Sequence, residues 1–414
     1  MNKIEKLINE LCPDGVEWKE LNKVILSLNT GLNPRKFFKL NTPDAKNYYI
    51  TIREIRKRHI NILESTDLIN DEALRLCNNR SNLEIGDVLF SGTGTIGQMV
   101  VIEEEPSNWN IKEGVYSIKP DSTKLNSRFL MYLLESEKIK QSYLKMKAGG
   151  TVQSIPMKAL RGLKIPVPPL EIQEEIVKIL DKFTDYVTEL TTELTLRQKQ
   201  YNYYRDKLFT FEGEKVEWKI LGDLSQVTKL AGYEFTKYVN YSNTGEIIAL
   251  RGLNVKNGKL KLDDLKYIDQ SDFSKLNRSK LFQNDMLFTY VGTVGEVALV
   301  DEDDKYYLAP NVALVRANSE IIIPKFLMYY FQSNDFKYKQ IEKLMQSSSM
   351  KNLTMEKIRK FLIPIPSIKS QNKIIEILDA LNMITNDINL GLPKEIELRQ
   401  KQYEYYRDKM LTFD

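Results

Sequence analysis

The sequence lacks the features of secreted and membrane proteins. It has two cysteines in 414 residues, no apolar N-terminal run that resembles a signal peptide, and no apolar stretch long enough to cross a bilayer. Cys12 and Cys77 have no neighbours at metal-ligand spacing, so we expect both to be small core or surface residues. The composition therefore argues against a disulfide framework, and we expect a cytoplasmic protein.

Residues that commonly carry catalysis are also scarce. His59 is the single histidine and has no evident nucleophile to serve, so we interpret it as a phosphate contact or a surface residue. There is no Gly-x-x-x-x-Gly-Lys-Ser/Thr phosphate loop, and no Asn/Asp-Pro-Pro motif of the kind that amino-methyltransferases use around a flipped base. We therefore predict a non-catalytic chain that holds no metal and no cofactor of its own.

The chain does contain a long internal duplication. Val16-Glu-Trp-Lys19 returns as Val216-Glu-Trp-Lys219. The segment Glu193–Phe211 matches Glu395–Phe413 at 14 of 19 positions. Matches at an offset of about 200 residues recur along the whole sequence, which indicates one structural unit that is used twice.

Each copy ends in a long helix. From Leu170 to Phe211, apolar residues alternate at spacings of three and four, which is typical of a coiled coil. The inward positions are predicted to be Ile176, Leu180, Phe183, Val187, Leu190, Leu194, Arg197, Tyr201, Tyr204, Leu208 and Phe211. The matching seam in the second copy implies one paired rod. Gly391-Leu-Pro393 lies inside that copy, and we predict a break or a kink there because an interior proline costs ~3 kcal/mol.

The globular part of each copy combines strands and helices. Short β-branched and aromatic runs between turn residues predict strands, and each copy then has a predicted helix, Ser127–Met146 or Pro324–Met345. The fold class is therefore α+β, with two similar α/β domains and two long helices. Proline-rich arms mark the boundaries, which gives domains at 1–164 and 213–362 and helical segments at 165–212 and 363–414.

Two motifs imitate chemical sites. Gly92-Thr-Gly-Thr-Ile-Gly97 fits the dinucleotide pattern, but a β-rich run follows it instead of a helix, and the second copy has Tyr290 at the first glycine. A hairpin turn is the better interpretation. Asp14, Glu17 and Lys19 resemble a nuclease triad. They are joined by one tight turn, however, so we expect their side chains to point apart instead of converging on one metal ion.

The net charge of +4 is small for this length, so any nucleic-acid surface must be local. Arginine and glutamine can pair with base edges, whereas lysine and backbone amides hold phosphates. The predicted DNA contacts of the first domain are Arg53, Arg56, Lys57, Arg58, Thr93, Thr95, Lys147, Gly149, Gly150, Thr151, Gln153 and Ser154. Those of the second are Arg251, Asn254, Lys256, Tyr290, Thr293, Ser347, Ser348, Ser349, Lys351 and Asn352. The alternative is a solvated charged face.

The chain resembles the specificity subunit of type I restriction-modification enzymes over its whole length. The resemblance rests on the Cys-Pro-Asp-Gly-Val-Glu-Trp opening at 12–18, the Ile-Pro-Val-Pro-Pro-Leu-Glu-Ile-Gln arm at 165–173, and the Leu-Arg-Gln-Lys-Gln-Tyr-x-Tyr-Tyr-Arg-Asp-Lys repeats at 196–207 and 398–409. It implies that each domain reads one half of a bipartite DNA site. It also implies that the helices form an antiparallel coiled coil that separates and inverts the two domains.

The resemblance also implies partners. Modification subunits would dock on this scaffold and use S-adenosylmethionine, and restriction subunits would carry ATP- and Mg-dependent translocation and cleavage. We expect Tyr203, Arg205, Tyr405 and Arg407 to help bind the modification subunits. The tandem Thr-Glu-Leu-Thr repeat at 188–195 resembles a ruler that sets the spacer between half-sites. The alternative function is a structural adaptor that binds only proteins.

Overall fold

The structure is a computed structural model that describes residues 2–34, 37–211, 215–230, 232–345, 352–386 and 390–413. The chain forms two compact units. Unit 1 comprises Met1–Glu189 and Ile396–Asp414, and unit 2 comprises Leu190–Glu395. The two units meet inside the long helix at 189/190, whereas the boundaries predicted from the sequence at 164, 212 and 362 separate domains from helical segments. This division into units does not test those boundaries, which stay predictions.

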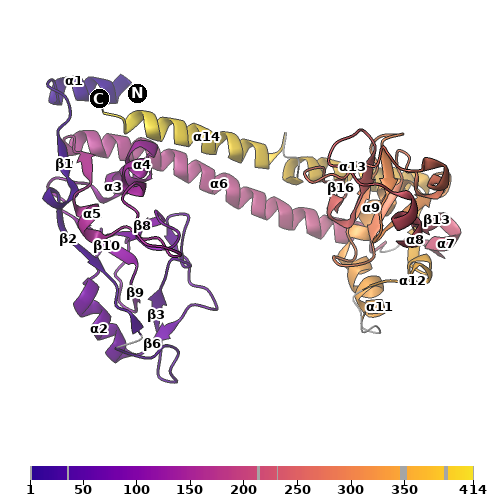
Figure 1. The fold of residues 1–414 in the computed structure, drawn as a ribbon, viewed down its shortest axis with the longest axis horizontal. Helices are drawn as coiled ribbons and strands as arrows, with labels where there is room; N and C mark the ends of the chain where they lie inside the picture. The colour runs from indigo at the N-terminus through magenta and orange to yellow at the C-terminus, as the bar shows by residue number, and fades with distance from the viewer. Residues whose placement is uncertain are drawn as a thin grey trace. The chain divides into compact units, whose positions relative to one another are not determined.

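Unit 1 is built on a four-stranded antiparallel sheet in the order β2-β10-β7-β8 (Figure 1). A three-stranded sheet, β6-β3-β9, and the pairs β1·β11 and β4·β5 complete its strands. The bounds are β1 (Trp18–Glu20), β2 (Ile25–Thr30), β3 (Asn47–Ile50), β4 (Ile55–Arg56), β5 (His59–Ile60), β6 (Leu68–Ile69), β7 (Val88–Ser91), β8 (Met99–Val101), β9 (Trp109–Ile111), β10 (Val115–Pro120) and β11 (Lys164–Pro166).

The sheet of unit 1 separates two cores. Side chains alternate along a strand, so Val88 and Phe90 of β7 pack in one core while Leu89 packs in the other. The larger core includes most helices of the unit. Those helices are α1 (Asn2–Leu11), the 3-10 turn η1 (Leu21–Lys23), α3 (Ser127–Glu135), α4 (Glu137–Leu144), α5 (Met157–Arg161), the first part of α6 (Leu170–Leu208) and most of α14 (Leu392–Met410). A further helix, α2 (Asp71–Ser81), packs in a third cluster with Tyr49 and Ile69.

The segment predicted as one helix from Ser127 to Met146 is divided in two. Ser136 ends α3 in an extended conformation, and its hydroxyl donates to the Leu133 carbonyl at 2.6 Å. The first amide of α4, at Glu137, then donates to Asp408 at 3.0 Å. A carboxylate at a helix N-terminus satisfies an amide that has no partner within the helix, so the new start is stabilised.

Helices α6 and α14 lie side by side in unit 1 (Figure 1). Phe183 stacks on Tyr406 with ring centroids 5.5 Å apart, and the Arg399 guanidinium lies 5.3 Å from the Tyr186 ring. Residue numbers fall along α14 as they rise along α6, so the pair is antiparallel, and this prediction is confirmed. The predicted break is also confirmed, because Leu390 and Gly391 belong to no helix and α14 begins at Leu392.

Unit 2 repeats this construction with the sheet β13-β20-β17-β18. Its other pairs are β12·β21, β14·β19 and β15·β16. The strands are β12 (Glu217–Ile220), β13 (Ser225–Lys229), β14 (Ile248–Leu250), β15 (Val255–Lys256), β16 (Lys259–Leu260), β17 (Met286–Thr289), β18 (Val297–Leu299), β19 (Tyr306–Leu308), β20 (Val312–Ala317) and β21 (Leu362–Ile365).

Most helices of unit 2 cover one face of its main sheet, whereas the short helix at residues 232–238 lies beside the turn at 273–275. Met286 and Phe288 of β17 pack with the covering helices, while Leu287 lies in a separate core. The helices are α7 (Leu221–Leu224), α8 (Gly232–Tyr238), α9 (Pro324–Gln332), α10 (Asn334–Phe336), the π-helix η6 (Lys337–Glu342), α11 (Lys343–Met345), α12 (Met355–Arg359) and α13 (Ile368–Asn386), with 3-10 turns η3 (Gly252–Asn254), η4 (Phe273–Lys275) and η5 (Asn277–Ser279). No helix in the described part of the chain is long and apolar enough to cross a membrane.

The heptad prediction is wrong near the end of α6. Tyr204 is 41% exposed, whereas Arg205 is only 7% exposed. A straight helix has 3.6 residues per turn and drifts against a strict 3.5-residue repeat. The inward face therefore passes from Tyr201 to Arg205 and then to Phe209, which packs in the core of unit 2.

Candidate DNA interface

The structure brings two polar loops of unit 1 together. The turn between β7 and β8 meets the loop at 147–154 through an antiparallel bridge of Thr93 with Ser154. The Gly94 amide donates to the Gln153 carbonyl at 3.1 Å, and the Ile155 amide donates to the Gly92 carbonyl at 2.8 Å. We call these segments loop pair 1. Its exposed predicted residues are Thr95, Lys147, Gly149, Gly150, Thr151 and Gln153, and Thr93 and Ser154 are half-buried.

Unit 2 forms the same arrangement, which we call loop pair 2. Val291 bridges Asn352, and the Leu353 amide donates to the Tyr290 carbonyl at 3.0 Å. Thr293 is exposed in this loop. The predicted contacts Ser347, Ser348, Ser349 and Lys351 lie outside the described residues.

The two loop pairs place their small and large residues at opposite positions, with glycine and tyrosine in unit 1 where unit 2 has tyrosine and alanine. Gly92 has no room for a side chain, because an added Cβ would lie 2.1 Å from the Tyr116 ring. The hydroxyl of Tyr116 donates to the Ile155 carbonyl at 2.7 Å and so ties the loop to β10. By strand register, Ala313 stands where Tyr116 does and Tyr290 where Gly92 does. The predicted hairpin interpretation of the glycines is confirmed, since β7 and β8 pair antiparallel.

A short hairpin that precedes the loop pair in each unit carries further predicted contacts. In unit 1, β4 and β5 enclose Lys57 and Arg58, whose φ angles are 51° and 62°. In unit 2, β15 and β16 enclose Asn257 and Gly258, at 50° and 82°. Such turns favour asparagine and glycine, because a side chain costs ~1–2 kcal/mol in the left-handed region. The Lys57–Arg58 turn is thus strained and needs other contacts to hold it.

The hairpin residues differ in availability. Arg53, Arg56 and Lys57 are exposed, although Arg53 also lies 3.4 Å from the Asp67 carboxylate. Arg58 points into unit 1 and pairs with Glu135. In unit 2, Lys256 occupies the place of Arg56 and is exposed as well.

Asn254 holds a loop together. It is fully buried, and its amide group donates to the Lys261 and Asp264 carbonyls at 2.8 and 2.9 Å. Its side-chain oxygen accepts from the Arg251 amide at 3.1 Å. In unit 1 the buried Glu54 has the same place, and accepts from the Thr51 amide at 2.8 Å. Arg251 is itself bonded to Asp264, so we assign Asn254 and Arg251 to the framework of the hairpin.

The residues predicted to bind partners divide into two kinds. Tyr203 and Tyr405 are each 60% exposed. Arg205 and Arg407 instead lie over the rings of Tyr201 and Tyr403, at 5.7 and 5.6 Å, and bond the aspartates beside them. The arginines therefore stabilise the helix ends, whereas the two tyrosines stay largely exposed and contact the rings of Tyr204 and Tyr406 beside them.

Sequence reasoning missed three residues near these sites. Asp206 accepts from the Asn334 amide at 2.9 Å, and Asp408 does the same for Glu137 in unit 1. The Lys229 ammonium lies 5.7 Å from the Tyr290 ring beside loop pair 2. The paired positions of the aspartates in the repeat were a usable signal, but nothing in the sequence connects Lys229 with the loop.

The duplication is also found when the sequence is compared with known protein families. The sequence matches the type I restriction modification DNA specificity domain twice, over residues 13–197 and 213–398. The chain belongs to this family. The predicted resemblance is thereby confirmed, and so is the fold of two similar domains with long helices.

Two curated relatives match the sequence of this specificity protein, and one solved chain matches its fold. A Haemophilus influenzae protein named as a type I restriction enzyme specificity subunit is 27% identical over 394 residues, which cover 83% of this chain and 94% of that protein. A type I restriction enzyme specificity subunit of Escherichia coli is 34% identical over 60% of this chain and 63% of its own length. A solved chain from a study of type I restriction-modification complex assembly has a TM-score of 0.64 at 16% identity, and covers 96% of this chain and 98% of its own.

Proposed function

We propose that this specificity subunit reads a bipartite DNA sequence, with one half-site for each unit. The observation that carries the proposal is the recurrence of the loop pair on one backbone frame with different side chains. Thr93 meets Ser154 in unit 1, and Val291 meets Asn352 in unit 2. A constant frame with variable polar residues suits two reading sites that share geometry and differ in the bases they select.

The proposed contacts are now the exposed members of each unit. Arg53, Arg56, Lys57, Lys147, Thr151 and Gln153 would serve unit 1. Lys256 and Thr293 would serve unit 2, together with the serines at 347–349 and Lys351 that the sequence predicts. Gln153 can make two bonds to an adenine edge, whereas the lysines suit phosphates. Because lysine and arginine contacts to phosphates release counterions from DNA, binding should weaken strongly with salt.

We further propose that the chain is non-catalytic and cytoplasmic, and that it works with modification and restriction subunits. Methyl transfer would use S-adenosylmethionine on the modification subunits. ATP and Mg would act on the restriction subunits. The absence of phosphate-loop and methyltransferase motifs in the sequence supports this division of labour. The exposed Tyr203 and Tyr405 are the residues that we expect to contact the modification subunits.

Selection from random duplexes by the complex with its modification subunit tests the proposal. We expect retention of one bipartite sequence. Gln153→Ala should relax one half-site by about 1–3 kcal/mol of discrimination per lost bidentate contact. Lys140→Ala, an exposed lysine of α4 outside the loops, is the matched control and should leave selection unchanged. Binding without sequence preference that vanishes at moderate salt would instead favour a protein adaptor.

A further inference from the structure

The side chain of Arg58 joins three elements of unit 1. Its Nε donates to Oε1 of Glu135 on α3 at 3.0 Å, and its Nη2 donates to Oε2 of Glu135 and to the Tyr403 hydroxyl on α14. The guanidinium carbon lies 4.9 Å from the ring centroids of both Tyr132 and Tyr403. A planar cation between two rings with a bidentate carboxylate is a specific fit for arginine.

This contact holds the strained hairpin. Burial works against the charge of Arg58, but the hydrogen bond and the charge of Glu135 outweigh it and raise the pKa of Arg58 above its usual value. The Tyr403 hydroxyl also donates to Oε2 of Glu135 at 3.2 Å, so all three side chains are bonded to one another. Lys57 at the same turn is exposed. Arg58 therefore fastens the turn of this hairpin to α3 and α14. Ile55 packs beneath it in a core, whereas Arg56, Lys57 and His59 face solvent.

Unit 2 builds the same place without that side chain. Tyr329 corresponds to Tyr132 in the repeat, and each donates to an aspartate of the following long helix at 2.6 Å. Gly258 replaces Arg58, and Gln332, three residues after Tyr329, replaces Glu135. Both members of the ion pair are thus replaced together.

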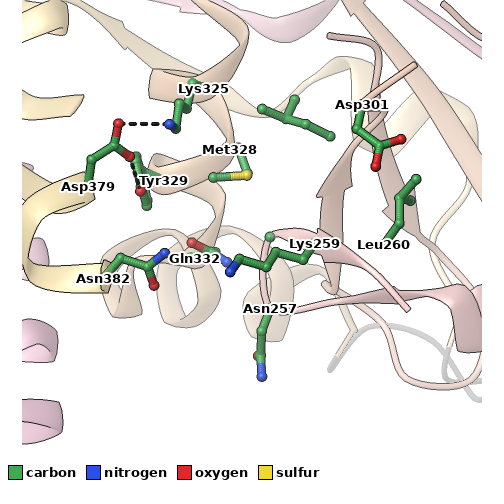
Figure 2. A pocket seen from close by; sticks show the side chains of 12 residues that line it. Asn257, Lys259, Leu260, Asp301, Lys325, Met328, Tyr329, Gln332, Asp379 and Asn382 are labelled. Carbon is green, nitrogen blue, oxygen red and sulfur yellow. Dashed lines mark hydrogen bonds and ion pairs between the residues drawn. The ribbon is translucent and has the colours of Figure 1, made fainter. Parts of the chain in front are cut away.

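An open space lies beside this turn of unit 2. A pocket of about 360 Å³ lies among Gly258, Tyr329, Gln332 and Asp379, and Figure 2 shows these α9 and α13 side chains around it. Here the hairpin is fastened through its backbone, since the Gly258 amide donates to the Val297 carbonyl at 2.8 Å. The hairpin of unit 2 is therefore held by a backbone hydrogen bond to β18 of the four-stranded sheet.

We propose that Arg58 is a positioning residue for DNA recognition by unit 1. It sets the place of Arg56 and Lys57 by clamping their turn to α3 and α14. Unit 2 needs no such clamp, because the Asn257–Gly258 turn is less strained and is bonded to β18. The inference rests on the proposed function, in that the hairpin is taken to contact DNA. A preorganised hairpin loses less freedom on binding and discriminates better.

The decisive variant is Arg58→Gly with Glu135→Gln, which gives unit 1 the pair that unit 2 carries. Glycine suits the left-handed turn, so the double variant should fold. In the free protein, amide hydrogen exchange at residues 55–60 should become about 10-fold faster or more, because local opening is easier. In the complex with modification subunits, sequencing of methylated DNA should show a relaxed half-site for unit 1 and an unchanged one for unit 2.

Two further variants sharpen the test. Arg58→Lys keeps the charge but loses the fork, and should fall between wild type and the double variant. Gly258→Arg with Gln332→Glu should slow exchange at residues 255–260. The side chain of residue 332 must move for this, because a Cβ added at Gly258 would lie 2.8 Å from the amide nitrogen of Gln332. Unchanged exchange in the double variant, or an equal loss at both half-sites, would overturn the positioning role. The exchange result needs no DNA, and failure of the wild type to select a bipartite site would instead sink the proposed function.

Discussion

Buried carboxylates are balanced differently in the two units. Asp285 is bonded by Arg316 through Nε at 2.7 Å and Nη2 at 2.6 Å. Its counterpart in unit 1, Asp87, is 1% exposed and accepts only from neutral groups, the Ser117 hydroxyl at 2.9 Å and the Glu84 amide at 3.1 Å. Burial raises the pKa of Asp87, so its charged form costs unit 1 stability.

The first prediction concerns this carboxyl group. Because the folded-state pKa of Asp87 lies above its unfolded value, its contribution to stability is present below the unfolded pKa of about 4 and is lost as pH rises through the folded pKa. Asp87→Asn should therefore raise the unfolding midpoint of unit 1 at pH 7 relative to wild type, with a smaller gain near pH 4. Thermal unfolding over that pH range measures the effect.

Asp285→Asn is the matched control. It leaves Arg316 beside a neutral amide and should destabilise unit 2 by about 1–3 kcal/mol at pH 7. Equal destabilisation by both substitutions would show that the two carboxyl groups play the same part, contrary to the structural difference.

At the scale of single elements, the two helical segments offer matched surface residues. The second prediction is that Tyr203→Ala with Tyr405→Ala weakens binding of the modification subunit. Each tyrosine is 60% exposed, and a buried interface tyrosine can contribute about 2 kcal/mol, so affinity should fall at least about 10-fold. Leu196→Ala with Leu398→Ala changes exposed residues at equivalent positions and should have little effect. Co-purification at unchanged affinity after loss of both tyrosines would remove them from the interface.

The third prediction concerns the tandem repeat in α6. Residues 188–195 lie where the chain passes from unit 1, which includes Glu189, to unit 2, which starts at Leu190. Deleting Thr192–Thr195 removes ~6 Å of helix and rotates its two ends by ~40°. On B-DNA this should shorten the recognised spacer by about one to two base pairs, with both half-sites intact.

Sequencing of methylated targets reads the spacer directly. The deletion also shifts the helical seam, so some loss of stability is expected in addition. Thr192→Ala with Thr195→Ala keeps the length and should keep the spacer. A folded, active deletion variant with the original spacer would rule out the ruler.

Much of the element pattern was predictable because it depends on local chemistry. Proline arms, the glycine turn at 92–97 and the break before Leu392 follow from backbone restrictions and are present in the structure. The break at Ser136 was missed, because it depends on Asp408 from the far end of the chain. The inward role of Arg58 was missed too, although its joint replacement with Glu135 between the two copies carried a signal.

At the scale of the whole molecule, the two units are separate modules. Each unit has its own sheet, cores and loop pair, and the contacts that hold each hairpin lie within that unit. Units that fold and hold their loops independently should contribute independent parts of the recognised sequence.

The fourth prediction tests this claim most directly. Residues 1 to about 160 would be exchanged for the corresponding part of a relative, and the target methylated by the assembled complex would be sequenced. The account predicts that one half-site takes the relative's sequence while the other half-site stays unchanged. A swap that alters both half-sites would contradict it.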